Sequence, residues 1–153
     1  MSQRTLGLAR DRSRGQDRSM ANATDMIREL MPLAATMGIR ADAYDADNVI
    51  LSMDWSPSLC TANGLLHGGA VMALADSAGA ACAVLNLPDG ATGTTTIESK
   101  TNFLGAVRQG SVSATPTVLH RGGTTIVVET VVRDDAGKLV AKVTQTQLVL
   151  RLR

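Results

Sequence analysis

The feature that most constrains this fold is a run of small, apolar residues from Gly68 to Leu87. Asp76 is the single charged residue in the run. The length of the run and its many alanines predict a helix. Because the run is apolar on all sides, we expect the helix to be enclosed by protein. A membrane span is the competing interpretation, but a weakly hydrophobic run with an internal aspartate would insert poorly, so no membrane partner is expected.

The chain that follows the predicted helix has the pattern of β-structure. Four strands are predicted, over residues 92–104, 110–120, 124–134 and 139–152. Glycine-containing turns separate them, and strands joined by short turns pair antiparallel. Upstream, the alternation of Val49, Leu51 and Met53 predicts another strand, with residues 39–44 as its hairpin partner. The expected class is α+β, an antiparallel sheet of five to six strands wrapped around one long central helix.

A short amphipathic helix is predicted over residues 24–37, with Thr24 as a candidate N-cap and Gly38 just past its end. Pro32 is an obstacle within this segment. A proline inside a helix removes a backbone donor and clashes with the preceding turn, so Pro32 can split the helix in two.

Charge divides the chain into two parts. Residues 1–24 contain five arginines and two aspartates, whereas residues 25–153 contain ten basic and twelve acidic residues. We expect residues 1–24 to form a basic, flexible arm, favouring a solvated tail over a nucleic-acid-binding arm, and residues 25–153 to form one folded domain. The domain is mildly acidic, and aromatic residues make up 2% of the whole chain. Both observations argue against a nucleic-acid partner, because such sites combine basic and aromatic side chains. No apolar signal segment is seen, so a cytoplasmic location with Cys60 and Cys82 reduced is expected.

The usual cofactor motifs are absent from the sequence. It holds no phosphate loop, dinucleotide fingerprint, paired zinc ligands or Gly-x-Ser-x-Gly elbow, so neither a cofactor nor a metal is expected. Asp76 is the residue that stands out. A carboxylate inside an enclosed helix costs several kcal/mol unless it is hydrogen-bonded, paired or neutral. A structural aspartate bonded to its own helix or to a buried Arg or Ser, and a catalytic aspartate, fit this position equally well.

The sequence Leu66-His67-Gly68-Gly69 precedes the predicted helix. Glycines at a helix start leave backbone N–H groups uncovered where the helix dipole favours negative charge, which suits an oxyanion; a plain capping turn is the alternative. Gly68 and Asp76 are eight residues apart, about 12 Å along a helix, too far to contact one acyl group. In a two-fold dimer with antiparallel helices, Gly68 of one chain would meet Asp76 of the other, forming two identical sites.

From about Ile39 to Leu150 the chain resembles the hotdog-fold acyl-CoA thioesterases of the PaaI type. The resemblance rests on the motif at residues 66–69, on Leu74-Ala75-Asp76 at the family's offset, on residues 96–103 and on residues 135–141. It implies that the Gly68 N–H binds the thioester carbonyl and that Asp76 of the other subunit acts as base or nucleophile. It also implies that the Thr96 hydroxyl orients water and that His67 holds the turn and assists at the carbonyl. The order of His67 before Asp76 disfavours the hydratase branch of the fold.

One position departs from the family pattern. The family commonly has Asn or Gln six residues before the motif histidine, where this chain has Thr61, and Asn63 lies nearby out of register. Thr61, Asn63 and Gly69 are therefore candidate contacts for acyl-CoA. Arg108, His120 and Arg121 are candidates for the phosphates of CoA, although surface turn residues are the plainer interpretation of all three.

The function that the resemblance implies is hydrolysis of acyl-CoA thioesters to free acid and CoA by a homodimer, itself expected to form a dimer of dimers. Two alternatives stay open. One is a non-catalytic acyl-CoA binding module with the same fold. The other makes Asp76 a buried residue that specifies the dimer.

Overall fold

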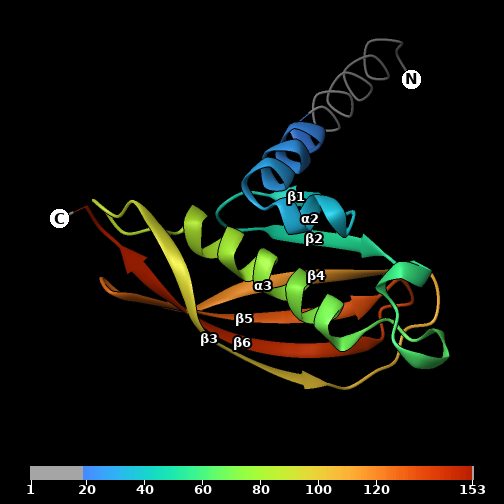
Figure 1. The fold of residues 1–153 in the computed structure, drawn as a ribbon. Coiled ribbons are helices and arrows are strands. Elements are labelled where there is room, and N and C mark those ends of the chain that lie inside the picture. Colours follow the sequence, from blue (N-terminus) through green and yellow to red (C-terminus); the bar gives the residue numbers. More distant parts are fainter. Residues whose placement is uncertain (1–18, 153) are drawn as a thin grey trace, which may run out of the picture.

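The computed structural model describes residues 19–152, and in it a curved antiparallel sheet packs around one long helix (Figure 1). The strands are β1 (Arg40–Tyr44), β2 (Val49–Asp54), β3 (Gly93–Phe103), β4 (Ser111–Arg121), β5 (Thr125–Asp134) and β6 (Leu139–Leu150), and the helix is α3 (Gly68–Leu85). The strand order is β1-β2-β4-β5-β6-β3, with every neighbouring pair antiparallel. The predicted α+β class, with six strands around a central helix, is confirmed.

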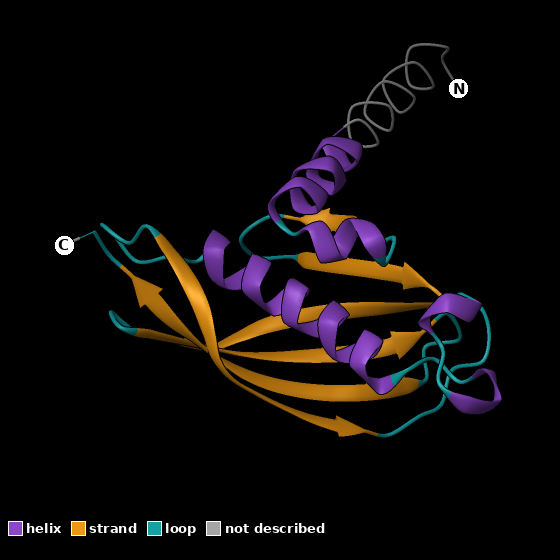
Figure 2. Cartoon of the chain, in the orientation of Figure 1, coloured by secondary structure: helices purple, strands orange, loops and turns teal. Residues whose placement is uncertain are grey.

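The helix α3 lies against one side of the sheet and contacts β2, β3, β4, β5 and β6 (Figure 2). By length and apolar composition alone it could cross a membrane, a test that the core helix of a folded domain also passes; in the structure it packs on the sheet. Leu74, Ala75 and Ala78 are fully buried, because small side chains let the strands approach closely. The expectation that the helix is enclosed on all sides is wrong for the single chain, since Met72 and Val84 face outward with 37% and 46% exposure.

The N-terminal segment is divided at Pro32, as the sequence suggested. Residues 19–30 are helical, and α2 (Pro32–Thr36) follows after a break at Met31. Gly38 follows the end of α2 with a φ of 68°, a conformation that glycine adopts without strain. The prediction of Thr24 as an N-cap is wrong, because Thr24 lies inside the first helix. Its hydroxyl instead accepts a hydrogen bond from the Ala41 N–H at 3.0 Å, which joins the helix to β1.

The predicted basic arm lies largely outside the described residues. Residues 1–18 are not described, so the arm stays a prediction there. Residues 19–24 belong to the first helix, and Ala23 on that helix is buried.

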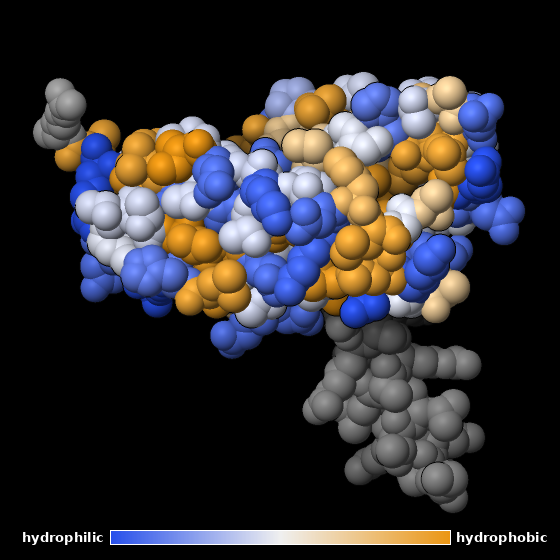
Figure 3. Space-filling view, turned by 90° about the horizontal axis from the view of Figure 1, so that it is seen from below, coloured by the Kyte–Doolittle hydropathy of each residue, from blue (hydrophilic) through white to orange (hydrophobic). Residues whose placement is uncertain are grey.

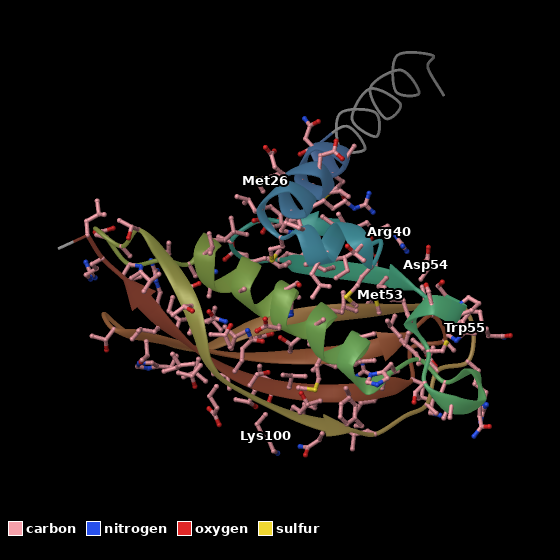
Figure 4. All side chains as sticks on the ribbon, in the orientation of Figure 1. Met26, Arg40, Met53, Asp54, Trp55 and Lys100 are labelled. Atoms are coloured by element: carbon pink, nitrogen blue, oxygen red, sulfur yellow. The ribbon has the colours of Figure 1, made fainter. Side chains whose placement is uncertain are left out.

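Polar contacts at one end of the sheet join β1 to β2 and tie the loop that leads into α3 to the end of β2. Arg40 on β1 forms an ion pair with Asp54 on β2 at 2.9 Å, and Figure 4 shows the two side chains next to each other. The Trp55 indole N–H donates to the Gly64 carbonyl at 3.1 Å. The loop before α3 is therefore tied to the end of β2.

The register of three strands places polar side chains under α3. Thr96 on β3 pairs with Gln147 on β6, and Gln147 pairs in turn with Ile126 on β5. A register shift between Thr96 and Glu98 leaves Ile97 as an extra residue on β3, the strand at the sheet edge. A bulge of this kind bends a strand and redirects its side chains.

Candidate active site

The first turn of α3 presents a free backbone donor. His67 is the N-cap, and its Nδ1 accepts a hydrogen bond from the Gly69 N–H at 2.8 Å. The His67 N–H itself donates to the Leu59 carbonyl at 2.8 Å, which anchors the turn. Among residues 19–152 no acceptor is bonded to the Gly68 N–H. This geometry agrees with the predicted role of His67 in holding the turn, and it leaves Gly68 able to bind an oxyanion.

The carboxylate of Asp76 is held by side chains of the sheet. The Thr96 hydroxyl donates to Asp76 Oδ1 at 3.0 Å, and Gln145 Nε2 donates to the same oxygen at 3.3 Å. Gln145 Nε2 also lies 3.4 Å from the Asp76 carbonyl oxygen. Within the described residues Asp76 forms no ion pair and no hydrogen bond through Oδ2. The carboxylate is thus fixed through one oxygen and is open at the other.

Gln145 and Gln147 are two site residues that the sequence reasoning missed. Both are fully buried, and Gln147 Nε2 donates to the Thr96 hydroxyl oxygen at 2.7 Å. Neither amide oxygen has a partner within the described residues. An unpaired buried acceptor costs about 1–3 kcal/mol of stability. Two such acceptors on one core strand therefore indicate that the two glutamines serve a purpose other than packing. The available signal was their alternate spacing between the apolar Val143 and Val149, which places all four side chains on one face of β6.

The loop before α3 brings three of the predicted substrate-binding residues together. Thr61 and Asn63 are exposed on this loop, and Arg108 Nη1 donates to the Asn63 carbonyl at 2.8 Å. Asn63 has a φ of 62°, a left-handed conformation that asparagine tolerates better than most residues. The Arg108 guanidinium thus lies beside the loop that leads to Gly68 and Gly69.

The other predicted phosphate ligands lie elsewhere. His120 and Arg121 are at the end of β4, and Arg121 Nη2 donates to the Leu87 carbonyl beyond the far end of α3 at 2.9 Å. The eleven residues of β4 span about 33 Å. Within one chain, Arg108 and Arg121 therefore cannot bind the same phosphate group.

A shallow, open apolar groove of about 370 Å³ lies beside the first turns of α3. It is lined by Leu33, Thr36, Met37, Ser58, Leu59, Cys60, His67, Gly69, Ala70 and Ala73. No Asp, Glu, Lys or Arg side chain lines it. The groove would accept the uncharged part of a ligand whose polar atom is bound at the Gly68 N–H.

The two halves of the candidate site do not meet within one chain. Gly68 and Asp76 are separated by about two turns of α3, about 12 Å. The Phe103 ring lies over Gly68, where an added Cβ would be 3.0 Å from Phe103 Cζ. No group of three or more His, Cys, Asp and Glu side chains in residues 19–152 is placed to hold a metal ion.

Comparison with known proteins places these features in a family. Residues 63–141 match the family described as Thioesterase superfamily. Thioesterase PA1618 of Pseudomonas aeruginosa is 33% identical over 102 residues, covering 67% of this chain and 70% of that protein. The structure of its glutamine-to-alanine variant has a TM-score of 0.78 and 28% identity, covering 84% of this chain and 94% of the other.

Two further structures extend the comparison. Thioesterase HI1161 of Haemophilus influenzae has a TM-score of 0.79 and 26% identity, covering 87% of this chain and 91% of its own. A hypothetical thioesterase protein of Streptococcus pneumoniae, crystallised with coenzyme A, has a TM-score of 0.67 and 23% identity, covering 75% of this chain and 88% of its own. At that identity it shows a shared fold alone.

Proposed function

The chain belongs to the thioesterase superfamily and is, in general terms, a hydrolase of thioesters; from this premise we propose that it hydrolyses acyl-CoA thioesters to the free acid and CoA. The observation that carries the proposal is the pairing of a carboxylate that is fixed through one oxygen with a helix N-terminal N–H that has no partner in residues 19–152. The PaaI type is the branch that the motifs resemble most.

The proposed reaction uses one water molecule and no cofactor. Asp76 Oδ2 accepts a proton from water as the water oxygen attacks the thioester carbonyl carbon. The carbonyl oxygen gains the negative charge, which the Gly68 N–H stabilises at the positive end of the helix. The tetrahedral intermediate then collapses, the C–S bond breaks, and the proton held by Asp76 passes to the leaving thiolate. The products are a carboxylic acid and the thiol of CoA.

Two chains are needed for this reaction. A single acyl group cannot contact Gly68 and Asp76 of one helix about 12 Å apart. Two antiparallel α3 helices related by a two-fold axis bring Gly68 of one chain to Asp76 of its partner. The outward side of α3 supports this arrangement, because the exposed Met72 lies one turn before Asp76 on a helix whose other side packs on the sheet.

The edge of the sheet offers a second surface for the partner chain. The edge strand β3 and the residue after it carry three large, exposed apolar side chains, Ile97, Phe103 and Leu104, each at least 52% exposed. Figure 3 views the molecule from the side on which β3 lies in Figure 1, and several hydrophobic patches are visible there. An unpaired edge strand with apolar side chains is a ready surface for pairing with another copy. We propose a homodimer, assembled further into a dimer of dimers.

Two observations support acyl-CoA as the substrate class. The neighbour from Streptococcus pneumoniae, which shares the fold, was crystallised with coenzyme A, and the groove beside Gly69, without Asp, Glu, Lys or Arg in its lining, would take the acyl group. Arg108, at the loop that leads into α3, is the cation we place nearest the CoA phosphates. His120 and Arg121 lie at the opposite end of β4 and would have to act on a site of the partner chain.

Replacing Asp76 tests the proposal directly. Asp76→Asn keeps an oxygen that accepts the Thr96 hydrogen bond but removes the base, so kcat should fall by at least about 10²–10³-fold while acyl-CoA still binds. Thiol release from a panel of aryl-acetyl, hydroxybenzoyl and straight-chain acyl-CoA esters measures the rate, and calorimetry measures binding.

Three outcomes would count against the proposal. A near-normal kcat for Asp76→Asn would remove Asp76 from the chemistry. A wild-type chain that binds acyl-CoA tightly but releases no thiol from any ester in the panel would be a binding module instead. If Asp76→Asn lowered the stability of the dimer and left the rate unchanged, Asp76 would be a residue that specifies the dimer.

A further inference from the structure

The buried side chains next to Asp76 form a directional chain of hydrogen bonds. Gln147 Nε2 donates to the Thr96 oxygen, and the Thr96 hydroxyl donates to Asp76 Oδ1. Gln145 Nε2 approaches the same Oδ1 from the neighbouring position on β6. Since a carboxylate oxygen and a hydroxyl oxygen that already donates its hydrogen can only accept, each glutamine must present its amide nitrogen. Chemistry therefore settles the orientation of both amides.

We propose that Gln145 and Gln147 position Asp76 for catalysis; we call these two residues the glutamine clamp. The proposal rests on the proposed function of Asp76. Gln145 donates to Oδ1 directly, and Gln147 holds the Thr96 hydroxyl that donates to the same oxygen, so that Oδ2 is left to take the proton from water. Neither glutamine touches the substrate, and both act through Asp76 and Thr96.

Burial supports a role beyond packing. Both glutamines are fully buried on a core strand, and both leave the amide oxygen without a partner in the described residues. An apolar residue of similar size would avoid that penalty, as Val143 and Val149 do on the same face of β6. The two amides therefore give hydrogen bonds to Asp76 and Thr96, while their unpaired oxygens lower the stability of the core.

Gly79 on α3 makes room for the clamp. A Cβ at Gly79 would lie 2.7 Å from Gln145 Nε2 and 2.5 Å from Gln145 Cδ, closer than such atoms approach in real structures. The amide is the far end of a flexible side chain and would move away from an added methyl group. Gly79→Ala should therefore leave α3 folded, since alanine favours helix, but should shift the Gln145 amide from Asp76.

The test is the kinetics of three single variants on the acyl-CoA ester that the wild-type chain hydrolyses fastest. Gln145→Met removes the donor at similar size, and Gly79→Ala displaces it. Each should lower kcat by about 10- to 100-fold with KM within about twofold, because a small misplacement of a catalytic group costs rate rather than binding. Thr130→Val is the matched control. It removes a fully buried hydroxyl without a partner in the described residues, on a strand that packs on the same helix, and should leave kcat unchanged.

The double variant separates positioning from general damage. If Gly79→Ala acts by displacing Gln145, then adding it to Gln145→Met should cost little further rate, whereas independent damage would multiply the two losses. Should Gln145→Met fail to fold, Gly79→Ala and Gln147→Met carry the test.

The outcomes for the clamp and for the proposed function are distinct. If Asp76→Asn loses its rate while Gln145→Met and Gly79→Ala keep theirs, the clamp is overturned and the function stands. Equal losses in Thr130→Val and Gln145→Met would also overturn the clamp, because any polar change in the core would then have the same effect. A wild-type chain that hydrolyses no ester would overturn the proposed function and the clamp with it.

Discussion

Asp76 is held in this protein by neutral donors rather than by a cation. Its partners are the hydroxyl of Thr96 and the amide of Gln145, and no Lys, Arg or His among the described residues pairs with it. An ion pair would neutralise the negative charge that the proposed reaction uses, whereas hydrogen bonds from neutral groups orient the carboxylate and leave its charge in place. At the scale of the residue, the candidate site is a carboxylate whose Oδ1 is fixed by two hydrogen bonds and whose Oδ2 has no partner within the described residues.

The buried Cys82 and the partly buried Tyr44 predict how stability depends on pH. Burial raises the pKa of the Cys82 thiol above its ordinary 9.0 and the pKa of the Tyr44 phenol above its ordinary 10.0. The folded chain therefore keeps protons that the unfolded chain loses above about pH 9. This contribution to stability is complete below pH 9 and is lost as the pH rises, so the urea midpoint should be lower at pH 10 than at pH 8.

Replacing the thiol isolates its share of that loss. Cys82→Ala removes one of the two groups, so its urea midpoint should fall less between pH 8 and pH 10 than that of the wild-type chain. A fall as large as in the wild-type chain would mean that Cys82 is not involved.

Single residues differed in how well the sequence could identify them. Asp76 stood out because it is charged within an apolar run, and His67-Gly68-Gly69 because glycines begin a helix. Gln145 and Gln147 gave a weaker signal, because their spacing in step with Val143 and Val149 places them on one face of the strand but does not say what that face contacts. The contacts of that face depend on the register of β6 against β3 and β5, which is set by the whole sheet.

At the scale of elements, patterns within one segment were reliable and contacts between segments were not. The predicted helix from Gly68 to Leu87 ends at Leu85, and the six strands lie within a few residues of their predicted limits. Thr24 is a cap candidate because it comes just before the amphipathic pattern that begins at Met26, yet the helix already includes residues 19–23. The bulge at Ile97 also escaped prediction, since nothing in its local sequence marks an extra residue on β3.

The first turn of α3 allows a matched pair of variants. Gly68 is the first helical residue, where proline is well tolerated, and the extended His67 before it is compatible with a following proline. Gly68→Pro removes the proposed oxyanion donor, whereas Gly68→Ala keeps the N–H and adds the same Cβ beside Phe103. We expect Gly68→Pro to lower kcat by about 10²–10³-fold and Gly68→Ala by much less.

Rates of thiol release for the two variants, with helix content checked by circular dichroism, measure this difference. Near-wild-type rates for both variants would show that the Gly68 N–H is not the oxyanion donor. Equal losses in both variants would place the effect on the Phe103 ring instead.

At the scale of the whole molecule, the proposed reaction has one chain supply two half-sites. Gly68 and Asp76 are fixed about 12 Å apart by the same rigid helix, so no side-chain motion can bring them to one carbonyl group. The exposed side of α3 and the apolar edge strand β3 are the surfaces through which a second copy would complete both sites. A thioesterase of this design would be active only as an assembly of at least two chains.

Complementation between two inactive variants tests this central claim most directly. Asp76→Asn and Gly68→Pro each damage both sites of their own homodimer. In a heterodimer of the two, one site carries both substitutions and the other carries neither. Co-expression followed by a thiol-release assay should therefore recover about a quarter of wild-type activity, since half of randomly formed dimers are mixed and each has one intact site. If the active site lay within one chain, every site would stay damaged and the mixture would be as inactive as either variant alone.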